Sequence, residues 1–275
     1  MAYNGEIITS AQNKYVSLAR SLGDKKGREK SSLFRFDGIK LMCEAVRKGV
    51  GIEFLIVAQS QYETVFARAE QLYKIGEGSL ECRIVVITDD LFARLSEENA
   101  PEGVICVARY DGELHKSVTA EEIPGFEGEK ILLLESVRDP QNVGAIIRVA
   151  AAFGVDRLVM SRDCADIYSA KTVRASMGTV FSLPICRVDS VVDAVSVLKA
   201  RGRRVFAAAL DENAARLGQL EILDGDCVVI GNEGHGLSPE TVSACTQSVY
   251  IPMSDGVESL NAATAAAVIM WEFFG

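Results

Sequence analysis

The second half of the chain alternates between short apolar segments and longer helical segments, and this pattern restricts the fold more than any other. The short segments show no regular alternation of polar side chains; they are ILLLESV (131–137), RLVMS (157–161), FSLPICRV (181–188), RRVFAAAL (203–210), CVVIG (227–231) and SVYIPM (248–253). A strand without a polar face is buried on both sides. Such strands, separated by helices, predict an α/β domain with a parallel sheet covered on both faces.

Two of the helical segments are apolar on nearly every side. Residues 142–153 (NVGAIIRVAAAF) carry one charge, Arg148, and residues 262–274 (AATAAAVIMWEFF) end the chain. A helix without a polar face is buried all round, either as a central core helix or against another subunit. Both alternatives stay open for the last helix. The apolar neighbours of Arg148 predict a paired or functional arginine instead of a solvated charge.

The first half reads as a smaller α/β domain. Residues 54–59 and 83–89 are apolar strands, residues 105–110 close the set, and residues 31–49 predict a strand, a turn and a helix. The polar, acidic stretch that follows reads as a linker. The predicted division is residues 1–110, a linker at 111–129, and a second domain at 130–275.

Charge is unevenly distributed along the chain. The net charge is −9, which disfavours indiscriminate nucleic-acid binding. Residues 14–48 nevertheless hold ten Lys/Arg against four Asp/Glu, a local +6, whereas residues 49–135 hold seven against seventeen, a local −10. The basic stretch is either a solvated helix face or a surface that contacts phosphate.

The remaining bulk features exclude several classes of protein. The seven cysteines are scattered and form no C-x-x-C pair, which predicts reduced thiols in a cytoplasmic protein. With two histidines and no clustered thiols, a metal site is not expected. No apolar run is long enough for a membrane span, and the N-terminus lacks the features of a signal peptide.

The segment VVIGNEGHGLS (228–238) has the strand, glycine loop and helix start of a nucleotide site. It lacks the spacing and lysine of a P-loop, and the chain has no G-x-G-x-x-G after its first parallel strand. Glu233 would repel a phosphate. The loop is therefore either a tight turn that needs its glycines, or a site for a phosphate-free nucleoside with positive charge. S-adenosyl-L-methionine fits the second description.

Two further segments have similar character. In RDPQNVGAIIR (138–148) the polar residues Asn142 and Arg148 enter an apolar helix, and in YIPMSDGVESLNAA (250–263) Ser259 and Asn261 stand at a helix start. Asn142, Ser259 and Asn261 are also predicted as plain helix caps. Both segments follow predicted strands, and open α/β sheets bind their ligands at the carboxyl ends of strands.

These three segments resemble, in order, the motifs of the SpoU (TrmH-like) branch of the SPOUT RNA methyltransferases. The matching stretches are Asp139–Arg148, Gly231–Ser238 and Ile251–Ala265, and KTVRASMGTVF (171–181) also fits. In the first half, FRFDGIKLMCEAVRKG resembles the signature of the substrate-binding domain of this family. Asp37 stands there where the family usually has glutamate. SEENAPEGVICVA resembles a second, looser segment of that domain.

The resemblance implies a trefoil-knotted SPOUT domain at 130–275, preceded by a ribosomal-protein L30e-like domain that binds the RNA substrate. It also implies a homodimer, formed through the knotted domain, that uses S-adenosyl-L-methionine to methylate a ribose 2′-hydroxyl in RNA. The implied catalytic residues are Arg148, Asn142, Glu233, Ser259 and Asn261. The implied cofactor-binding residues are Gly231, Ile251, Leu260, Leu210, Asn232 and Met253, and the implied RNA-binding residues are Arg174, Arg35 and Lys40.

The residue types suggest how such a site would work. Methyl transfer from a sulfonium needs in-line attack by a hydroxyl oxygen, so positioning and charge stabilisation dominate. A guanidinium keeps its proton at neutral pH, so we expect Arg148 to anchor phosphate and stabilise the developing alkoxide instead of acting as a base.

Three hypotheses follow for the function. The first is an RNA 2′-O-methyltransferase; the separate first domain favours large-subunit (23S) ribosomal RNA, with transfer RNA as the alternative. The second is a non-catalytic RNA-binding protein of the same fold, motivated by the basic stretch. The third, a nucleotide-dependent oxidoreductase, is disfavoured because the G-x-G-x-x-G motif is missing.

Overall fold

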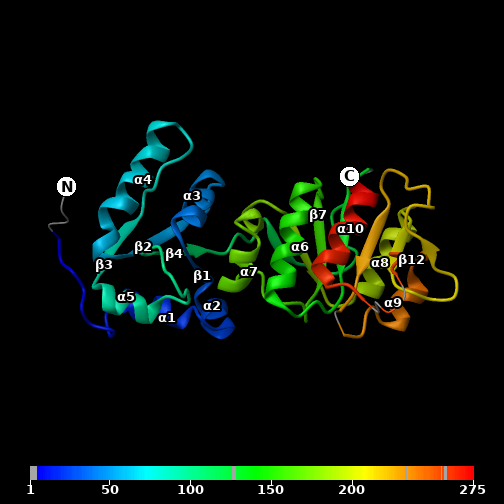
Figure 1. The fold of residues 1–275 in the computed structure, drawn as a ribbon, viewed down its shortest axis with the longest axis horizontal. Helices are drawn as coiled ribbons and strands as arrows, with labels where there is room; N and C mark the ends of the chain where they lie inside the picture. Colours follow the sequence, from blue (N-terminus) through cyan, green and yellow to red (C-terminus); the bar gives the residue numbers. More distant parts are fainter. Residues whose placement is uncertain (1–4, 126–127, 233, 255, 257–258) are drawn as a thin grey trace. The chain divides into compact units, whose positions relative to one another are not determined.

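The computed structural model describes residues 5–125, 128–232, 234–254, 256 and 259–275. The chain forms two compact units, each with its own sheet (Figure 1). Unit 1 consists of Met1–Asp111 and Asp166–Phe181, and unit 2 of Gly112–Ala165 and Ser182–Gly275. Among the described residues, no helix combines the length and apolar character needed to cross a bilayer.

Unit 1 has a four-stranded mixed sheet in the order β1-β4-β2-β3. Its strands are β1 (Leu33–Asp37), β2 (Ile52–Ala58), β3 (Arg83–Ile87) and β4 (Val104–Arg109), and β2 and β3 are the parallel pair. Its helices are α1 (Lys14–Ser21), α2 (Lys25–Ser31), α3 (Ile39–Arg47), α4 (Tyr62–Lys74), α5 (Asp89–Leu95) and α7 (Ala170–Ala175). Short 3-10 turns lie at Gln59–Gln61 and Thr179–Phe181.

The apolar strands of unit 1 are covered on both faces. Alternate residues such as Phe54 and Ile56 pack with α1 and α5 in one core. Helices α3 and α4 lie on the opposite side of the sheet (Figure 1). The interpretation of the first half as a small α/β domain is therefore confirmed in its strands, although helices α1 and α2 were not predicted individually.

Residues 166–181 pack in unit 1, although the sequence assigns them to the second domain. Helix α7 packs on β1, and the Tyr168 ring stacks on Tyr110 with centroids 4.0 Å apart. Phe34 packs against both Tyr168 and Phe181 at centroid distances of 4.7 and 6.2 Å. This aromatic cluster shows that the first unit is completed by a segment from the second half of the chain.

A buried ion pair holds the start of this segment. Arg28 is 4% exposed; its Nε and Nη2 donate to Asp166 at 3.0 and 2.7 Å, and its Nη1 donates to the carbonyl of Leu22. The guanidinium thus joins α2, the α1–α2 turn and the segment that begins at Asp166. Its donors are used inside the protein, so its charge does not face solvent.

We expect Arg28→Met to lower the free energy of unfolding by about 3 kcal/mol, because Asp166 would remain buried without its counter-charge. Urea unfolding followed by circular dichroism measures this. The matched control is Arg109→Ala, which breaks an exposed pair with Glu53 and should cost less than about 1 kcal/mol. Equal small effects for both variants would show that the buried pair does not hold the segment.

Unit 2 has an eight-stranded sheet in the order β10-β12-β9-β11-β6-β7-β8-β5, with parallel pairing throughout. Its strands are β5 (His115–Ser117), β6 (Ile131–Leu134), β7 (Arg157–Ser161), β8 (Ile185–Val188), β9 (Val205–Ala208), β10 (Ala215–Arg216), β11 (Cys227–Ile230) and β12 (Gln247–Tyr250). Its helices are α6 (Pro140–Ala152), α8 (Val191–Ala200), α9 (Pro239–Ala244) and α10 (Ala262–Phe274).

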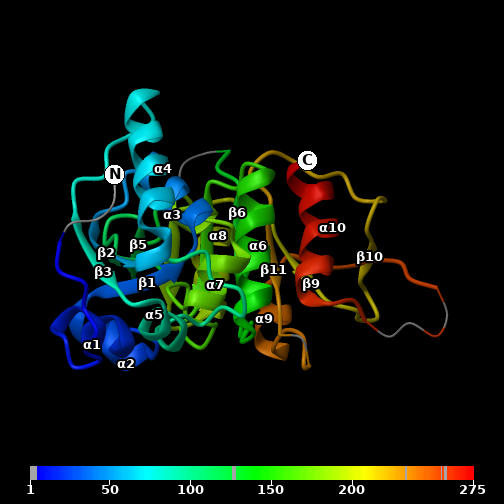
Figure 2. The same ribbon diagram turned by 60° about the vertical axis from the view of Figure 1, so that its left-hand side comes forward.

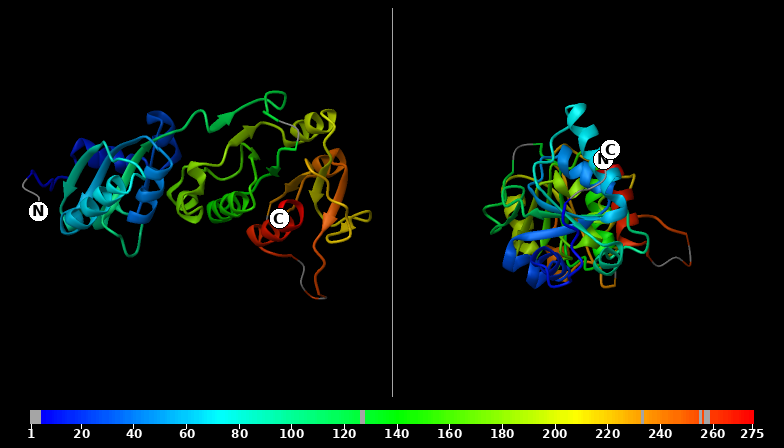
Figure 3. Two further views of the ribbon diagram at one scale, coloured as in Figure 1. Left: turned by 90° about the horizontal axis from the view of Figure 1, so that it is seen from above. Right: turned by 90° about the vertical axis from the view of Figure 1, so that its left-hand side faces the viewer.

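Helices cover both faces of this sheet, as predicted. Helices α6 and α10 lie side by side on one face, and α8 lies on the other (Figures 2 and 3). Val195 and Leu198 of α8 pack with Leu133 and Val229, whereas the ring of Phe273 meets Phe206 at 5.3 Å. The buried strands explain why the sequence shows no alternation.

Three details differ from expectation. The segment expected as a linker contains β5, which pairs with β8. Asp139, not Asn142, caps α6 with Pro140 after it, because the Asp139 carboxylate accepts from the Gln141 N–H. Helix α10 is not buried on every side, since Val268 and Trp271 are 39% and 66% exposed. The interpretation of α10 as a central core helix is wrong for the single chain.

Candidate active site

The predicted cofactor residues gather at one edge of the unit 2 sheet. Strands β12, β9 and β11 are neighbours and parallel, so their carboxyl ends lie at the same edge. Leu210 follows β9, Gly231 follows β11, and Ile251 and Met253 follow β12. The sheet order therefore brings together residues that lie up to 43 positions apart, from 210 to 253, as the strand-end interpretation expects.

The loop after β11 is held tightly closed by its own backbone. Asn232 and Gly236 exchange two backbone hydrogen bonds of 2.9 and 3.0 Å. A Cβ on Gly231 would lie 2.4 Å from the backbone carbon of Gly236, so glycine is required by close approach. The tight-turn interpretation is thus correct for Gly231, and it does not exclude a ligand beside the turn.

The side chain of Asn232 also organises this loop. Its Nδ2 donates to the carbonyl of Ser136 at 2.8 Å, and its Oδ1 accepts from the N–H groups of Gly234 and His235. The amide therefore joins the loop after β11 to the loop after β6. Glu233, the predicted catalytic residue next to it, lies outside the described residues.

Glu135 is a site residue that the sequence analysis missed. Its carboxylate accepts from the N–H of Ser238 at 2.9 Å, from the Ser238 hydroxyl at 3.0 Å and from the Thr241 hydroxyl at 2.7 Å. Ser238 caps α9 through the Thr241 N–H. A carboxylate at a helix N-terminus is favourable electrostatically. Its position directly after strand β6 was the only signal in the sequence, and one glutamate after an apolar strand is not a distinctive pattern.

Asn142 and Asn261 meet although 119 positions separate them. The Nδ2 of Asn261 donates to the Oδ1 of Asn142 at 2.9 Å. Asn142 is 7% exposed on α6, whereas Asn261 caps α10 by accepting from the N–H groups of Ala263 and Thr264. The predicted cap role is confirmed for Asn261 and wrong for Asn142. The pair fixes the start of α10 against α6.

Arg148 is exposed on α6, so of the two alternatives from the sequence, a paired or a functional arginine, the described residues do not supply the pairing partner. The buried face of α6 carries Val143, Ile146, Ile147 and Ala150, and Arg148 lies on the other side. Within the part of the chain that the structure describes, it makes no hydrogen bond or ion pair. The physical reason is that the neighbouring apolar residues point into the sheet while the helix turns Arg148 outward.

Several predicted cofactor residues are apolar and exposed. Leu210, Met253 and Leu260 are 79%, 41% and 36% exposed, and Ile251 is half-buried. Ser259 is exposed next to Leu260. Exposed leucine and methionine side chains at one sheet edge are characteristic of a ligand-binding or protein-binding surface.

A polar network lies at the neighbouring ends of β6 and β7. The Ser161 hydroxyl donates to Asp163 at 2.6 Å and accepts from the Ser136 N–H, while Arg138 pairs with Asp163 at 2.9 Å. Burial alone would raise the pKa of Asp163, but hydrogen bonds from Ser161, Arg138 and Ser136 lower it to about 2. Asp163 is therefore charged at neutral pH and fixes Ser136, the partner of Asn232.

The predicted RNA-binding residues of unit 1 have different environments. Lys40 is exposed on α3. Arg35 is 5% exposed, donates to the Leu95 carbonyl and pairs with Glu97 at 2.5 Å, so its guanidinium does not face solvent. The prediction that Arg35 contacts RNA conflicts with this burial, which arises because Arg35 lies on the covered strand β1.

Arg174 on α7 is 43% exposed and pairs with Glu98 at 3.0 Å. Nearby Asp37, in the family signature, is 4% exposed and accepts from the Ser96 hydroxyl. Burial raises the pKa of Asp37 and of Glu98, and Arg174 lowers both. Arg174 thus already neutralises carboxylates within unit 1.

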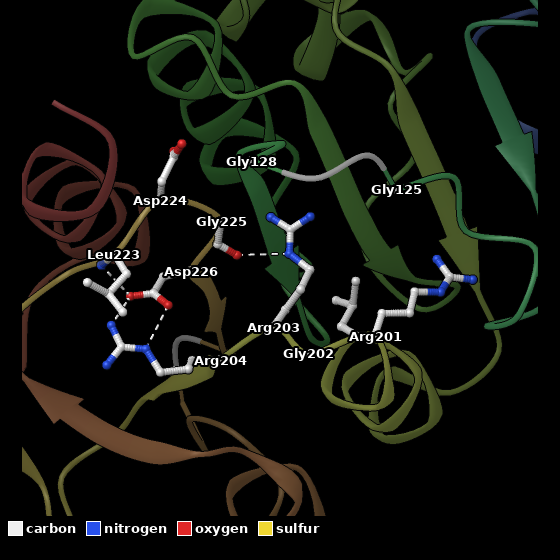
Figure 4. A pocket seen from close by; sticks show the side chains of 11 residues that line it. Gly125, Gly128, Arg201, Gly202, Arg203, Arg204, Leu223, Asp224, Gly225 and Asp226 are labelled. Carbon is white, nitrogen blue, oxygen red and sulfur yellow. Dashed lines mark hydrogen bonds and ion pairs between the residues drawn. The ribbon is translucent and has the colours of Figure 1, made fainter.

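A cavity of about 590 Å³ lies at the opposite edge of the unit 2 sheet, where β9 and β11 begin (Figure 4). Arg201, Arg203 and Arg204 line it, but Arg204 pairs with Asp226, and Arg201 donates to the carbonyls of Glu121 and Ile123. Arg203 donates to the carbonyls of Gly225 and Glu129. These arginines hold loops together, and none of the predicted site residues that the structure describes lines this cavity.

Known proteins share this architecture. Residues 129–271 match the SpoU rRNA Methylase family, and residues 13–106 match the MRM3-like substrate binding domain. The S-adenosylmethionine-bound rRNA methyltransferase from Sinorhizobium meliloti superposes with a TM-score of 0.79 at 28% identity, over 97% of this chain and 96% of that chain. The cofactor complex of the SpoU methyltransferase AviRb from Streptomyces viridochromogenes gives 0.78 at 29% identity, over 95% and 97%.

Two relatives of known name match this chain over almost its full length. The chain is 30% identical to the 23S rRNA (guanosine(2553)-2′-O)-methyltransferase RlmP of Bacillus subtilis, over 98% of this chain and 99% of that protein. It is 31% identical to the 23S rRNA (uridine(2479)-2′-O)-methyltransferase of Streptomyces viridochromogenes, over 96% and 90%.

The parallel sheet and the loops at its carboxyl edge, together with these matches, define an α/β methyltransferase of the SPOUT type. All three sequence motifs fall within residues 129–271. The chain belongs to the SpoU rRNA methylase family. The resemblance inferred from the sequence is confirmed.

Proposed function

We propose that this protein transfers a methyl group from S-adenosyl-L-methionine to a ribose 2′-hydroxyl of 23S rRNA. The observation that carries the proposal is the convergence of three motif loops at one sheet edge, joined by the Asn142–Asn261 and Asn232–Ser136 hydrogen bonds. The two full-length relatives with 23S rRNA in their names support the substrate class.

The residues at the sheet edge fit the cofactor. Leu210, Met253 and Leu260 offer apolar surface for an adenosine, and the described part of the 231–238 loop carries no Lys or Arg that would call for a phosphate. We propose that Gly231, Ile251 and Leu260 contact the cofactor mainly through backbone. Leu210, Asn232 and Met253 would line the adenosine. When bound, the cofactor supplies an electrophilic methyl group.

The chain's own residues would position and stabilise the reaction. In methyl transfer the ribose oxygen would bond to the methyl carbon, the S–C bond would break with its electron pair left on sulfur, and the hydroxyl proton would pass to solvent water. We propose that the exposed guanidinium of Arg148 stabilises the alkoxide that develops on this oxygen. Asn142 and Asn261 hold α6 and α10 together, and Ser259 and Glu233 complete the site from the adjacent loops.

We propose that Lys40 and Arg174 contact RNA phosphate, whereas buried Arg35 supports β1. The ion pair with Glu98 would then compete with RNA for Arg174. This competition supplies a direct test of the role of Arg174.

We expect Glu98→Gln to raise RNA affinity roughly two- to five-fold, because a neutral amide no longer offsets the charge of Arg174. Filter binding with a 23S rRNA fragment measures this. Glu102→Gln is the control. It removes the same charge, but Glu102 accepts a hydrogen bond from the Ile39 N–H and does not pair with Arg174. If Glu98→Gln raises RNA affinity equally when it is added to an Arg174→Ala variant, the proposed role of Arg174 is contradicted.

We further propose that two copies pair through α6 and α10 of a trefoil-knotted domain. The exposed stripe of α10, Thr264, Val268 and Trp271, lies beside Phe153 of the α6 end, whose ring meets Trp271 at 5.9 Å. Such an apolar face beside α6 supports self-association. Sedimentation equilibrium measures it: a monomer at micromolar concentration would contradict the pairing.

The domain division (1–110, 111–129 and 130–275), the L30e-like nature of the first domain and the cytoplasmic location remain part of this proposal. The match of residues 13–106 to a substrate-binding domain supports the division in its outline. Asp166–Phe181 packs in unit 1, so one segment of the proposed second domain belongs to the first compact unit.

Transfer of tritiated methyl groups to unmodified ribosomal RNA tests the proposed function. We expect incorporation into 23S rRNA and cofactor binding by calorimetry. Incorporation into transfer RNA alone would favour the tRNA enzyme instead. RNA binding with neither cofactor binding nor incorporation would favour a non-catalytic RNA-binding protein.

A further inference from the structure

Helices α1 and α2 present a dense set of basic side chains to solvent. They lie side by side within unit 1 (Figures 1 and 2). The exposed basic residues, which we name the α1–α2 basic surface, are Lys14, Arg20, Lys25, Lys26 and Lys30. The exposed acidic residues on the same two helices and their turn are Asp24 and Glu29, which leaves a local net charge of +3.

The two acidic residues are already engaged. Asp24 caps α2 by accepting from the Gly27 N–H at 2.8 Å, and Glu29 lies 3.7 Å from Lys25. That pair is exposed on both sides, so solvent screens it strongly. The lysines therefore keep most of their charge available for an external anion.

The two helices that carry this surface are held together by a backbone contact and by the side chain of Arg28. A Cβ on Gly27 would lie 1.8 Å from the Ser21 carbonyl oxygen, so the end of α1 and the start of α2 are in direct backbone contact. Arg28, in the middle of the basic stretch, is turned inward to Asp166 and to the carbonyls of the α1–α2 turn. One arginine thus fixes the hairpin, and the other five cations remain outside.

The charge of the rest of the protein makes this surface distinctive. Unit 1 carries 17 Lys/Arg and 17 Asp/Glu, and unit 2 carries 12 and 21. A polyanion is therefore repelled by unit 2 as a whole and attracted only where positive charge is concentrated. The lysine-rich hairpin is such a place.

We propose that the α1–α2 basic surface contacts the phosphate backbone of the RNA substrate and positions it without reading its sequence. The proposal rests on the proposed function for the identity of the RNA. Tyr15, the aromatic residue of this hairpin, packs edge-on against Phe54 at 5.1 Å and is not free to stack on a base. Lysine contacts to phosphate fix register and orientation, whereas specificity needs contacts to bases.

The composition of the surface distinguishes RNA from a lipid membrane. None of the large exposed apolar side chains lies on α1 or α2, both of which the structure describes in full. A helix that binds a bilayer surface inserts such side chains among the head groups. Lysines without apolar neighbours fit a phosphodiester chain better.

The test compares two triple variants with the same loss of charge. Lys25→Gln, Lys26→Gln and Lys30→Gln remove three cations from the proposed surface. Control substitutions elsewhere on unit 1 are Lys48→Gln, Arg68→Gln and Lys74→Gln, all at exposed positions. The affinity of each for a 23S rRNA fragment and for an unrelated RNA of equal length is measured from 0.05 to 0.3 M salt, roughly the range over which phosphate contacts dominate.

We expect the first triple variant to lose affinity on the order of 100-fold near 0.1 M salt, with the slope of log K against log salt reduced by about 2 to 3. The loss should be equal for both RNAs, and cofactor affinity by calorimetry should not change. A loss no larger than in the control triple would overturn the proposal, and so would a loss confined to the 23S fragment.

Two further outcomes separate this proposal from others. If the wild type binds RNA through this surface but transfers no methyl group, the proposed function fails and the surface assignment stands. If methyl transfer is intact and the first triple variant binds RNA normally, the surface assignment fails alone. Binding to phosphatidylserine–phosphatidylcholine vesicles that is lost in this variant, with RNA affinity unchanged, would overturn the proposal in favour of a membrane.

Discussion

Arg148→Ala is expected to lower kcat for methyl transfer roughly 10²- to 10³-fold, the usual cost of removing a group that stabilises a developing oxyanion. Stability should change by less than about 0.5 kcal/mol, because the side chain is exposed and forms no contact that the fold needs. Single-turnover methyl transfer, with cofactor affinity from calorimetry, separates the chemical step from binding.

Arg148→Lys is the informative companion. Lysine keeps the positive charge but loses the planar fork, so it should recover part of the activity if charge stabilisation dominates. Full activity in Arg148→Ala would remove Arg148 from the mechanism. An alanine variant that has lost cofactor affinity in proportion to its rate would instead make Arg148 a binding residue.

Gly231→Ala is expected to weaken cofactor binding by roughly 5- to 150-fold, and methyl transfer at limiting cofactor by the same factor. The added Cβ would meet the backbone carbon of Gly236 at 2.4 Å and the amide nitrogen of Leu237 at 2.6 Å. Backbone atoms cannot step aside as a flexible side chain can, so the loop must open at a cost of about 1 to 3 kcal/mol. Calorimetry with S-adenosyl-L-methionine is the measurement.

Gly234→Ala in the same loop is the matched control. There the nearest atom to an added Cβ is the Oδ1 of Asn232 at 3.5 Å, an ordinary contact. This variant should fold and bind cofactor nearly as the wild type does. If both variants bind equally well, the closed geometry of the 231–238 loop is not what the cofactor requires.

Much of the fold was predictable because strands that are buried on both faces consist of continuous apolar residues. The continuous apolar runs of β6 and β11 could only be strands covered on both faces, and the structure places them side by side. The loop at 231–238 was recognisable because its glycines lie close together in the sequence. Asn261 as a cap followed from its position before an apolar helix.

Other features depend on contacts between distant residues, which local patterns do not record. Asn142 looked like a cap because it precedes apolar residues, but Asp139 takes that role and Asn142 pairs with Asn261 instead. Arg35 looked like a surface charge within a basic stretch, yet strand β1 is covered and Glu97 neutralises it. In both cases the partner lies more than 60 positions away.

The sequence also contained no sign that Asp166–Phe181 packs in unit 1. The composition of its short helix α7 does not distinguish it from the helices of unit 2. Its packing in unit 1 is seen only from the aromatic cluster and the Arg28–Asp166 ion pair. Glu135 was missed because a single glutamate after an apolar strand has no distinctive pattern. Its three hydrogen bonds to the start of α9 exist only after the sheet forms.

Mapping of 2′-O-methylated nucleotides in 23S rRNA, from cells with and without this protein, tests the central claim most directly. We predict that one ribose methylation disappears when the protein is absent and returns with the wild-type chain but not with Arg148→Ala. An unchanged methylation map in 23S rRNA, with or without the protein, would contradict the proposed function.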